Sequence, residues 1–162
     1  DIDSIFNVID AGSGKSFYSK KYFLVKNRNK LCISKLIKDR IIEISKEKNN
    51  IKDPIKMSLK FVDNFKLNEI KNKKVAVLNY HKLEFPLTIR NWKEGDWFIP
   101  SGMKGKKKLS DYFIDNKFSL IEKKRCFVLC SNNEIVWIVG HRIDERYKFV
   151  DGLEKAYICQ IN

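Results

Sequence analysis

Short apolar runs of strand length recur along the chain and are separated by polar links. They occupy residues 22–25, 31–36, 41–44, 55–61, 75–78, 87–89, 97–99, 126–129, 135–139 and 157–161. Runs of this length, bounded by Asn, Asp, Gly and Ser, are typical of β-strands. The first two flank the tripeptide Asn27-Arg28-Asn29, which predicts a hairpin. Links rich in structure-breaking residues at 46–54 and 67–74 separate the strands that follow.

Helical spacing is clear only in the second half of the chain. Leu109, Tyr112 and Phe113 stand at positions i, i+3 and i+4, which predicts an amphipathic helix. Ser119 and Glu122 have the spacing of a capping box, in which each side chain satisfies the other residue's backbone amide. We therefore expect a second short helix to begin after Ser119.

The runs at 126–129 and 135–139 are apolar at consecutive positions and flank a polar turn at 131–134. Strands that are apolar on both faces are covered on both faces, so we place this hairpin at the centre of the sheet system. The run at 157–161 is expected to close the sheet. Strands dominate, and the sequence predicts a mainly β fold of the α+β class with an inserted short helical pair.

The net charge of the chain indicates which class of partner it binds. The 162 residues include 33 Lys and Arg against 20 Asp and Glu, a net charge of +13, with a pI near 9.6. Such an excess makes nucleic acid the first partner to consider and an anionic membrane surface the second. Of the 33 cations 27 are Lys, which contacts phosphate as a flexible point charge, so we expect recognition of backbone and shape.

Apolar run length, the cysteines and the first residue indicate the cellular compartment and whether the chain is a fragment. The longest apolar runs, such as 135–139, are far shorter than the roughly 18 residues of a membrane span. The four cysteines stand in strand-like apolar runs, which indicates reduced thiols in a cytoplasmic protein. Because the chain starts with Asp1 and shows no signal peptide, we expect an internal or C-terminal fragment of a longer protein.

Motifs for catalysis or metal binding are incomplete. Gly12–Ser16 resembles a nucleotide loop, but position 9 is Ile and a strand-like run follows. Cys126 and Cys130 would lie about 13 Å apart on a strand, too far to share a zinc ion. His81 and His141 lie in no nucleophile motif. We predict no catalytic residue, metal ligand or cofactor in this chain.

The strongest local signal is a basic cluster around a glycine-rich turn. Between Arg90 and Arg125 there are ten Lys or Arg and five acids, and Gly102 and Gly105 precede the predicted helix. Backbone amides at such a turn and ammonium groups favour phosphate. We expect phosphate contacts from Arg90, Lys104, Lys106, Lys107, Lys108 and Arg142. Secondary candidates are Lys93, Lys117, Arg125 and Arg146, and turn-shaping residues are Gly95, Asp96, Gly102 and Gly105.

Several motifs in register resemble the C-terminal domain of bacterial tRNA(Ile)-lysidine synthase. They are Leu87-x-x-Arg90, Gly95-Asp96, Pro100-x-Gly102-Met103-x-Gly105, Lys107-Lys108-Leu109-x-x-x-Phe113-x-Asp115 and Val136-Trp137-x-x-Gly140-x-Arg142-Ile143-Asp144. The resemblance covers about residues 83–148, and the first eighty residues look like the variable region that precedes this domain. We therefore expect a strand-rich preceding region at 1–83, packed on the rest of the chain, and a tRNA-binding domain at 84–162.

The resemblance implies a function for the parent enzyme. That family joins free lysine to the wobble cytidine of an isoleucine tRNA, using ATP and Mg, in an N-terminal domain with a Ser-Gly-Gly-x-Asp-Ser loop. This chain lacks the loop, so the fragment is expected to be inert by itself. The C-terminal domain is similar to a domain of the phenylalanyl-tRNA synthetase β subunit, a layered β-sandwich, and grips the tRNA body, chiefly the acceptor stem. Beyond Lys148 this chain departs from the family pattern.

Two other interpretations stay open at this point. In the first, the lysines are solvated surface and the fold docks on the catalytic domain or on a second copy of the chain. In the second, the chain is an enzyme that uses His141 with Asp144 or Cys130. Charge reversal at 106–108 separates the first from tRNA binding, and turnover abolished by His141→Ala would support the second.

Overall fold

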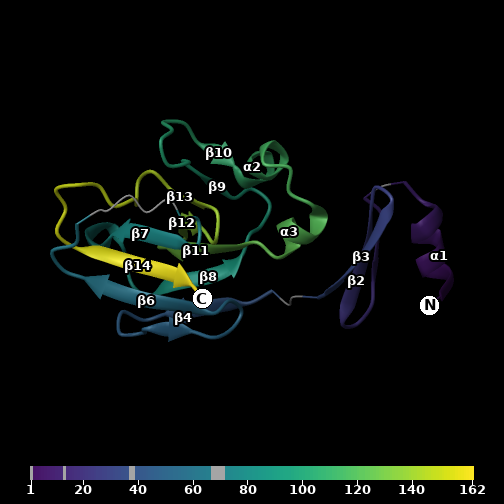
Figure 1. The fold of residues 1–162 in the computed structure, drawn as a ribbon, viewed down its shortest axis with the longest axis horizontal. Coiled ribbons are helices and arrows are strands. Elements are labelled where there is room, and N and C mark those ends of the chain that lie inside the picture. Colours follow the sequence, from purple (N-terminus) through teal and green to yellow (C-terminus); the bar gives the residue numbers. More distant parts are fainter. Residues whose placement is uncertain (1, 13, 37–38, 67–71) are drawn as a thin grey trace. The chain divides into compact units, whose positions relative to one another are not determined.

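The computed structural model describes residues 2–12, 14–36, 39–66 and 72–162. The chain forms two compact units (Figure 1). The small unit comprises Asp1–Asp39 and Phe113–Arg125, and the sandwich unit comprises Arg40–Tyr112 and Cys126–Asn162. None of the helices in the described ranges combines the length and apolar character needed to span a lipid bilayer.

The small unit carries a three-stranded antiparallel sheet. Its strands β1 (Ser16–Tyr18), β2 (Tyr22–Asn27) and β3 (Lys30–Lys35) lie in the order β1-β2-β3. The predicted hairpin is confirmed, with Arg28 in the left-handed region at φ 53° between β2 and β3. Because a strand and not a helix follows Gly14, the stretch does not have the structure of a phosphate-binding nucleotide loop; Ser13 lies outside the described residues.

The predicted capping box is also confirmed. The helix α3 (Leu120–Lys124) starts after Ser119, whose Oγ accepts from the Glu122 amide at 3.2 Å. The Ser119 amide in turn donates to Glu122 Oε2 at 2.7 Å. The helix α1 (Ile2–Asp10), in contrast, was not predicted. Its signal was the spacing of Ile2, Ile5, Phe6 and Ile9 at i, i+3, i+4 and i+7, in a segment short enough to be overlooked.

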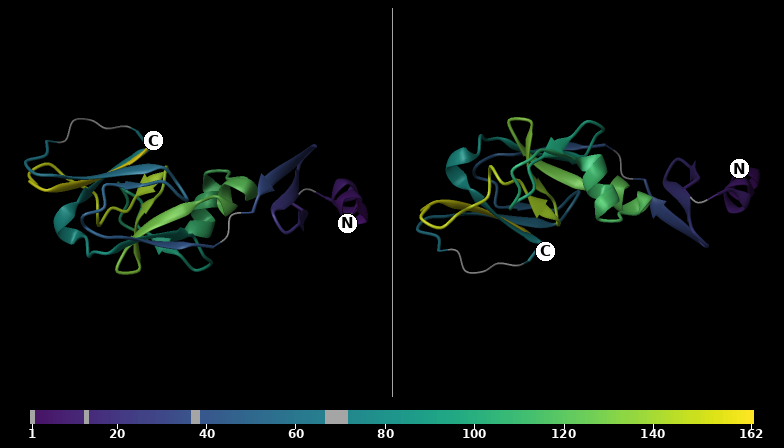
Figure 2. Two further views of the ribbon diagram at one scale, coloured as in Figure 1. Left: turned by 90° about the horizontal axis from the view of Figure 1, so that it is seen from below. Right: turned by 90° about the horizontal axis from the view of Figure 1, so that it is seen from above.

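Two antiparallel sheets form the layers of the sandwich unit (Figure 2). The five-stranded sheet has the order β13-β12-β11-β8-β4, with β4 Ile41–Ile44, β8 Leu87–Asn91, β11 Phe127–Ser131, β12 Glu134–Ile138 and β13 Arg142–Ile143. The four-stranded sheet has the order β5-β6-β14-β7, with β5 Asn50–Ile51, β6 Met57–Val62, β7 Val75–Asn79 and β14 Ala156–Ile161. A 3-10 helix, η1 (Tyr80–Lys82), follows β7. The predicted mainly β fold with several sheets is therefore confirmed.

The central position of the β11–β12 hairpin is confirmed as well. Every residue of β11 is buried, and β11 pairs with β12 on one side and β8 on the other. Asn132 and Asn133 turn the hairpin with φ of 46° and 62°. Trp137 at 1% exposure is one of the largest fully buried side chains. Continuous apolar runs in the sequence thus mark the strands that other elements cover on both faces.

Strands from both sides of the expected boundary at residue 83 pair with one another. Strand β4 pairs with β8, so that Ile42 lies opposite Ile89, and β6 and β7 both pair with β14. Residues 40–66 and 72–83 are therefore part of the sandwich, because their strands supply pairing partners for the later strands. For the same reason β14 lies inside its sheet, between β6 and β7, and does not close it. Of the link predicted at 67–74, residues 67–71 lie outside the described residues.

Candidate nucleic-acid interface

Residues 93–108, which we call the basic hairpin, lie between β8 and the helix α2 (Leu109–Asp115). The chain turns at Gly95 (φ +88°), runs through β9 (Trp97–Phe98), turns again at Gly102 (φ +86°) and returns as β10 (Lys107–Lys108). Strand β10 pairs with β9, so that Lys108 lies opposite Trp97. Positive φ at both turns explains why glycine stands there, whereas Gly105 has no positive φ.

One side of the basic hairpin is fixed by a bidentate ion pair. The Arg90 guanidinium donates to both carboxylate oxygens of Asp96 at 2.8 and 2.9 Å, and the Lys93 amide donates to the same carboxylate at 2.9 Å. The two side chains are only 13% and 8% exposed. The hydrogen bonds to Asp96 raise the pKa of Arg90. Arg90 was predicted to contact phosphate, but its guanidinium is occupied inside the turn, so we remove it from the candidates.

Replacing Arg90 by alanine is expected to lower the free energy of unfolding by about 2–3 kcal/mol, since Asp96 keeps its burial but loses two charged hydrogen bonds. Lysine at this position is expected to recover only part of the loss, because it lacks the planar fork. Urea denaturation measures both variants, with Arg125→Ala, an exposed arginine, as the matched control. Equal stability of Arg90→Ala and Arg125→Ala would contradict this role.

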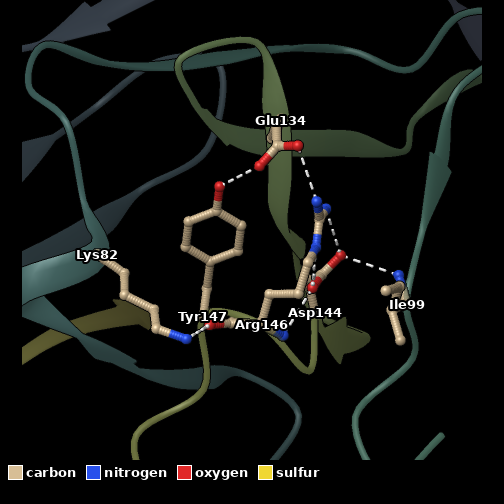
Figure 3. Close-up of polar contacts among 6 residues, drawn as sticks. All are labelled: Lys82, Ile99, Glu134, Asp144, Arg146 and Tyr147. Carbon is tan, nitrogen blue, oxygen red and sulfur yellow. Dashed lines mark hydrogen bonds and ion pairs between the residues drawn. The ribbon is translucent and has the colours of Figure 1, made fainter. Parts of the chain in front are cut away.

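Asp144 anchors a second buried network (Figure 3). Its carboxylate is fully buried and accepts four hydrogen bonds, from the Ile99 amide at 2.9 Å, the Arg146 amide at 2.8 Å and the Arg146 side chain at 3.0 and 2.9 Å. Ile99 follows β9, so Asp144 joins the basic hairpin to the end of β13. Hydrogen bonding to Asp144 raises the pKa of Arg146.

The same network extends from Arg146 to the β11–β12 turn. Arg146 Nη1 donates to Glu134 Oε1 at 2.8 Å, and the Tyr147 hydroxyl donates to Glu134 Oε2. The hydrogen bond from Tyr147, followed by the contacts with Arg146, lowers the pKa of Glu134. The pKa of Tyr147 is raised mainly by burial and further by its bond to Glu134. The Arg146 guanidinium also lies 4.8 Å from the Trp97 ring centroid. Arg146, a secondary candidate for RNA contact, is therefore held by the fold.

The network weakens the interpretation as a stand-alone enzyme. Four donors occupy the Asp144 carboxylate, so it offers no free oxygen to act as a base. Burial raises the pKa of the Cys130 thiol to about 11, and at neutral pH such a thiol is almost entirely protonated. The same effect raises the pKa of Cys126 to about 12. Neither thiol has the properties of a catalytic nucleophile.

Two backbone amides of the turn at Gly102, which were expected to be free for phosphate, already have partners. The Gly102 amide donates to Glu145 Oε2 at 2.6 Å, and the Met103 amide donates to the Pro100 carbonyl at 2.8 Å. Strand β10 also separates this turn from α2, so the turn is not a helix N-terminus. The sequence did not reveal the partner of the Gly102 amide, because Glu145 is 43 positions away. These two amides are therefore not available to phosphate.

Five cationic side chains remain exposed on or beside the basic hairpin. They are Lys93, Lys104, Lys106, Lys108 and Arg142. Arg142 belongs to β13, but its Nη2 donates to the Ser101 carbonyl at 2.5 Å, which holds it beside the Gly102 turn. The Lys106 ammonium lies 3.8 Å from the Trp97 ring centroid. Arg142 therefore lies beside the turn between β9 and β10, and we call these five side chains the cation set.

The other candidates have different positions. Lys107 is half-buried in β10 and keeps contacts of its own. Lys117 and Arg125 belong to the small unit. Lys82, which sequence reasoning missed, donates from Nζ to the Arg146 carbonyl at 2.8 Å (Figure 3). No sequence signal marks Lys82, because 64 positions separate it from Arg146.

Comparison with known proteins matches two parts of the chain to family models. Residues 1–37 match the model described as the TilS substrate binding domain. Residues 87–159 match the model described as the TilS substrate C-terminal domain, and this range includes the whole basic hairpin and Arg142.

Similar curated proteins carry one name. The tRNA(Ile)-lysidine synthase of Parabacteroides distasonis is 48% identical over 159 residues, which are 96% of this chain and 36% of that protein. The tRNA(Ile)-lysidine synthase of Bacteroides thetaiotaomicron is 34% identical over 160 residues, which are 99% of this chain and 36% of that protein. The chain thus spans about a third of the length of these relatives.

A solved structure supports the fold. The crystal structure of a TilS C-terminal domain superposes with a TM-score of 0.60 at 18% sequence identity, covering 76% of this chain and 95% of the other. At this identity the likeness concerns the fold alone. It agrees with the several sheets of the described residues.

Proposed function

The chain belongs to the tRNA(Ile)-lysidine synthase family, as its C-terminal region, and we propose that it grips the tRNA body through the cation set. The observation that carries this proposal is the clustering of exposed cations along one short hairpin and its neighbour Arg142. The arginines with fixed partners, Arg90 and Arg146, brace the hairpin from within. The lysines are left to meet phosphate.

The chemistry of the cation set fits a double-stranded RNA backbone. Four of its five members are lysines, which contact phosphates as point charges and do not supply the fork that reads guanine edges. The deep groove of an RNA helix excludes side chains, so proteins contact its phosphates and 2′-hydroxyls. By resemblance to the family, the RNA helix is the acceptor stem of an isoleucine tRNA.

The activity of the whole protein is part of the same proposal. We place this chain in an enzyme that ligates lysine to the wobble cytidine of an isoleucine tRNA with ATP and Mg, in the cytoplasm. The reaction would take place in a catalytic domain elsewhere in that protein, with this chain as the anchor on the tRNA body. Exposed apolar side chains of the small unit, Phe6 at 57% and Ile33 at 71%, are suited to contact that domain.

Binding of tRNA to the 162-residue chain tests the proposal through its salt dependence. A cation set that neutralises about five phosphates should give a log–log slope of affinity against salt of roughly −3.5 to −4.5. Fluorescence anisotropy of labelled tRNA over a series of salt concentrations measures this slope. A flat response, or self-association of the chain without tRNA binding, would contradict the proposal and favour a protein-docking role.

A further inference from the structure

A small pocket lies beside the basic hairpin, and the proposed function as stated does not use it. It is lined by Gly95, Asp96 and Trp97 of the hairpin, by the β11–β12 turn from Asn132 to Ile135 and by Arg146. Its volume is about 190 Å³. We propose that this pocket receives one unpaired nucleobase of the bound RNA. The inference rests on the proposed function and adds a base contact to a site otherwise limited to phosphates.

The size of the pocket limits its ligand. Small-molecule sites usually measure about 300–1,000 Å³, so 190 Å³ is too small for a nucleotide cofactor and suits a single heterocycle. Trp97 is the one aromatic residue among the described residues that line the pocket. Base–aromatic stacking tolerates every base, because every base has a π-face. Trp97 is therefore suited to stack with a nucleobase of any kind.

Two cationic side chains contact the Trp97 ring. Arg146 packs against the ring and cannot leave, because Asp144 and Glu134 hold its guanidinium. Lys106 covers the ring at 3.8 Å but is exposed, and a cation–π contact at an exposed site is weak. Lys106 does not line the pocket, so a nearby phosphate could draw its ammonium away without changing the lining. A base in the pocket would meet Trp97 beside the fixed Arg146 guanidinium.

Carboxylates also line the pocket. Glu134 and Asp96 both line it, and the hydrogen bond from Tyr147 and the charge of Arg146 keep Glu134 ionised by lowering its pKa. Each of these carboxylates already pairs with an arginine, Asp96 with Arg90 and Glu134 with Arg146. Carboxylate oxygens can still accept hydrogen bonds from the N–H groups of a base edge, while the adjacent lysines take the phosphate.

The turn adds amide groups that are free to bind. Within the described ranges the side chains of Asn132 and Asn133 make no hydrogen bond, although both line the pocket. An amide supplies two donors and one acceptor, the combination that pairs with base edges. The positive φ of both residues is compatible with glycine, so their side chains can be removed without straining the turn.

The experiment compares two short oligoribonucleotides of equal length, one normal and one with every base removed. Both carry the same phosphates, so their affinity ratio isolates the contribution of the bases. We expect the normal oligonucleotide to bind the 162-residue chain about tenfold more tightly, since a stacked base contributes a factor of this order. Trp97→Leu should bring the ratio close to one, and Trp97→Phe should keep most of it.

The double variant Asn132→Gly/Asn133→Gly should lower the ratio about threefold, with Asn64→Gly, another exposed asparagine at positive φ, as the matched control. If Trp97→Leu fails to fold, this double variant still tests whether the pocket binds a base. A ratio near one in the unmodified chain, or a ratio that none of these substitutions changes, would overturn the inference. Salt-dependent binding of the base-free oligonucleotide would then still support the proposed function, whereas its absence would count against that function itself.

Discussion

Replacing Asp144 by alanine is expected to lower the free energy of unfolding of the sandwich unit by about 3–5 kcal/mol, the largest effect of any single substitution discussed for this chain. The carboxylate is fully buried and accepts four hydrogen bonds. Its removal leaves the Ile99 amide without its acceptor and the Arg146 guanidinium without its main counter-ion. A cavity remains where the carboxylate stood, which adds to the loss.

The isosteric variant Asp144→Asn refines this expectation. An asparagine keeps the shape and one accepting oxygen but turns a donor toward the Arg146 guanidinium. We therefore expect its free energy of unfolding to lie between those of the wild type and Asp144→Ala. Urea denaturation measures both variants, and Asp151→Ala, an exposed aspartate of the same unit, is the control. If Asp144→Ala unfolded at the same urea concentration as Asp151→Ala, the network in Figure 3 would not be an anchor of the fold.

Replacing Lys104, Lys106 and Lys108 together by alanine is expected to reduce tRNA affinity by about 10- to 100-fold at low salt. Each lysine that neutralises a phosphate releases counterions, so the triple variant should also reduce the steepness of the salt dependence by about 2–3. The side chains are exposed, and the variant should unfold at the wild-type urea concentration. Anisotropy titrations at several salt concentrations give both quantities.

The control for this variant removes the same number of charges elsewhere in the sandwich unit. Lys48, Lys52 and Lys56 are exposed lysines outside the basic hairpin. If tRNA responds only to net charge, the control triple variant will lose as much affinity as the first. Equal losses would contradict a localised cation set, whereas a control within about twofold of wild type supports it.

Local sequence predicted most of the strands and helices because their signals are local. The β2–β3 hairpin, the helix at Leu109 and the capping box of Ser119 each depend on residues fewer than about fifteen positions apart. The central place of β11 followed from its unbroken apolar run, since burial on both faces leaves no polar positions. The pairing of β4 with β8 across residue 83 could not be predicted from local sequence, because it joins segments that are far apart along the chain.

Local sequence likewise predicted only part of the candidate site. The lysines of the basic hairpin are neighbours in sequence, so their clustering is visible in the order of residues alone. Arg90 was expected to contact phosphate and Arg146 was a secondary candidate, yet both are bound to buried carboxylates. An arginine in the sequence does not reveal whether its guanidinium meets solvent or a carboxylate, because the partner is chosen by packing. The pocket beside Trp97 likewise requires the β11–β12 turn to lie next to the hairpin.

The cationic character of this protein, its strand-rich fold and the location of its lysines could all be obtained from the amino-acid order, since charge and hydrophobic period belong to single residues and their neighbours. Which cations are free is a property of the folded chain. Four carboxylates accept hydrogen bonds from arginines or backbone amides, and several of these contacts join distant positions; they belong to Asp96, Asp144, Glu134 and Glu145. Buried polar groups must be paired, so folding selects partners across the chain and leaves the exposed lysines at the surface.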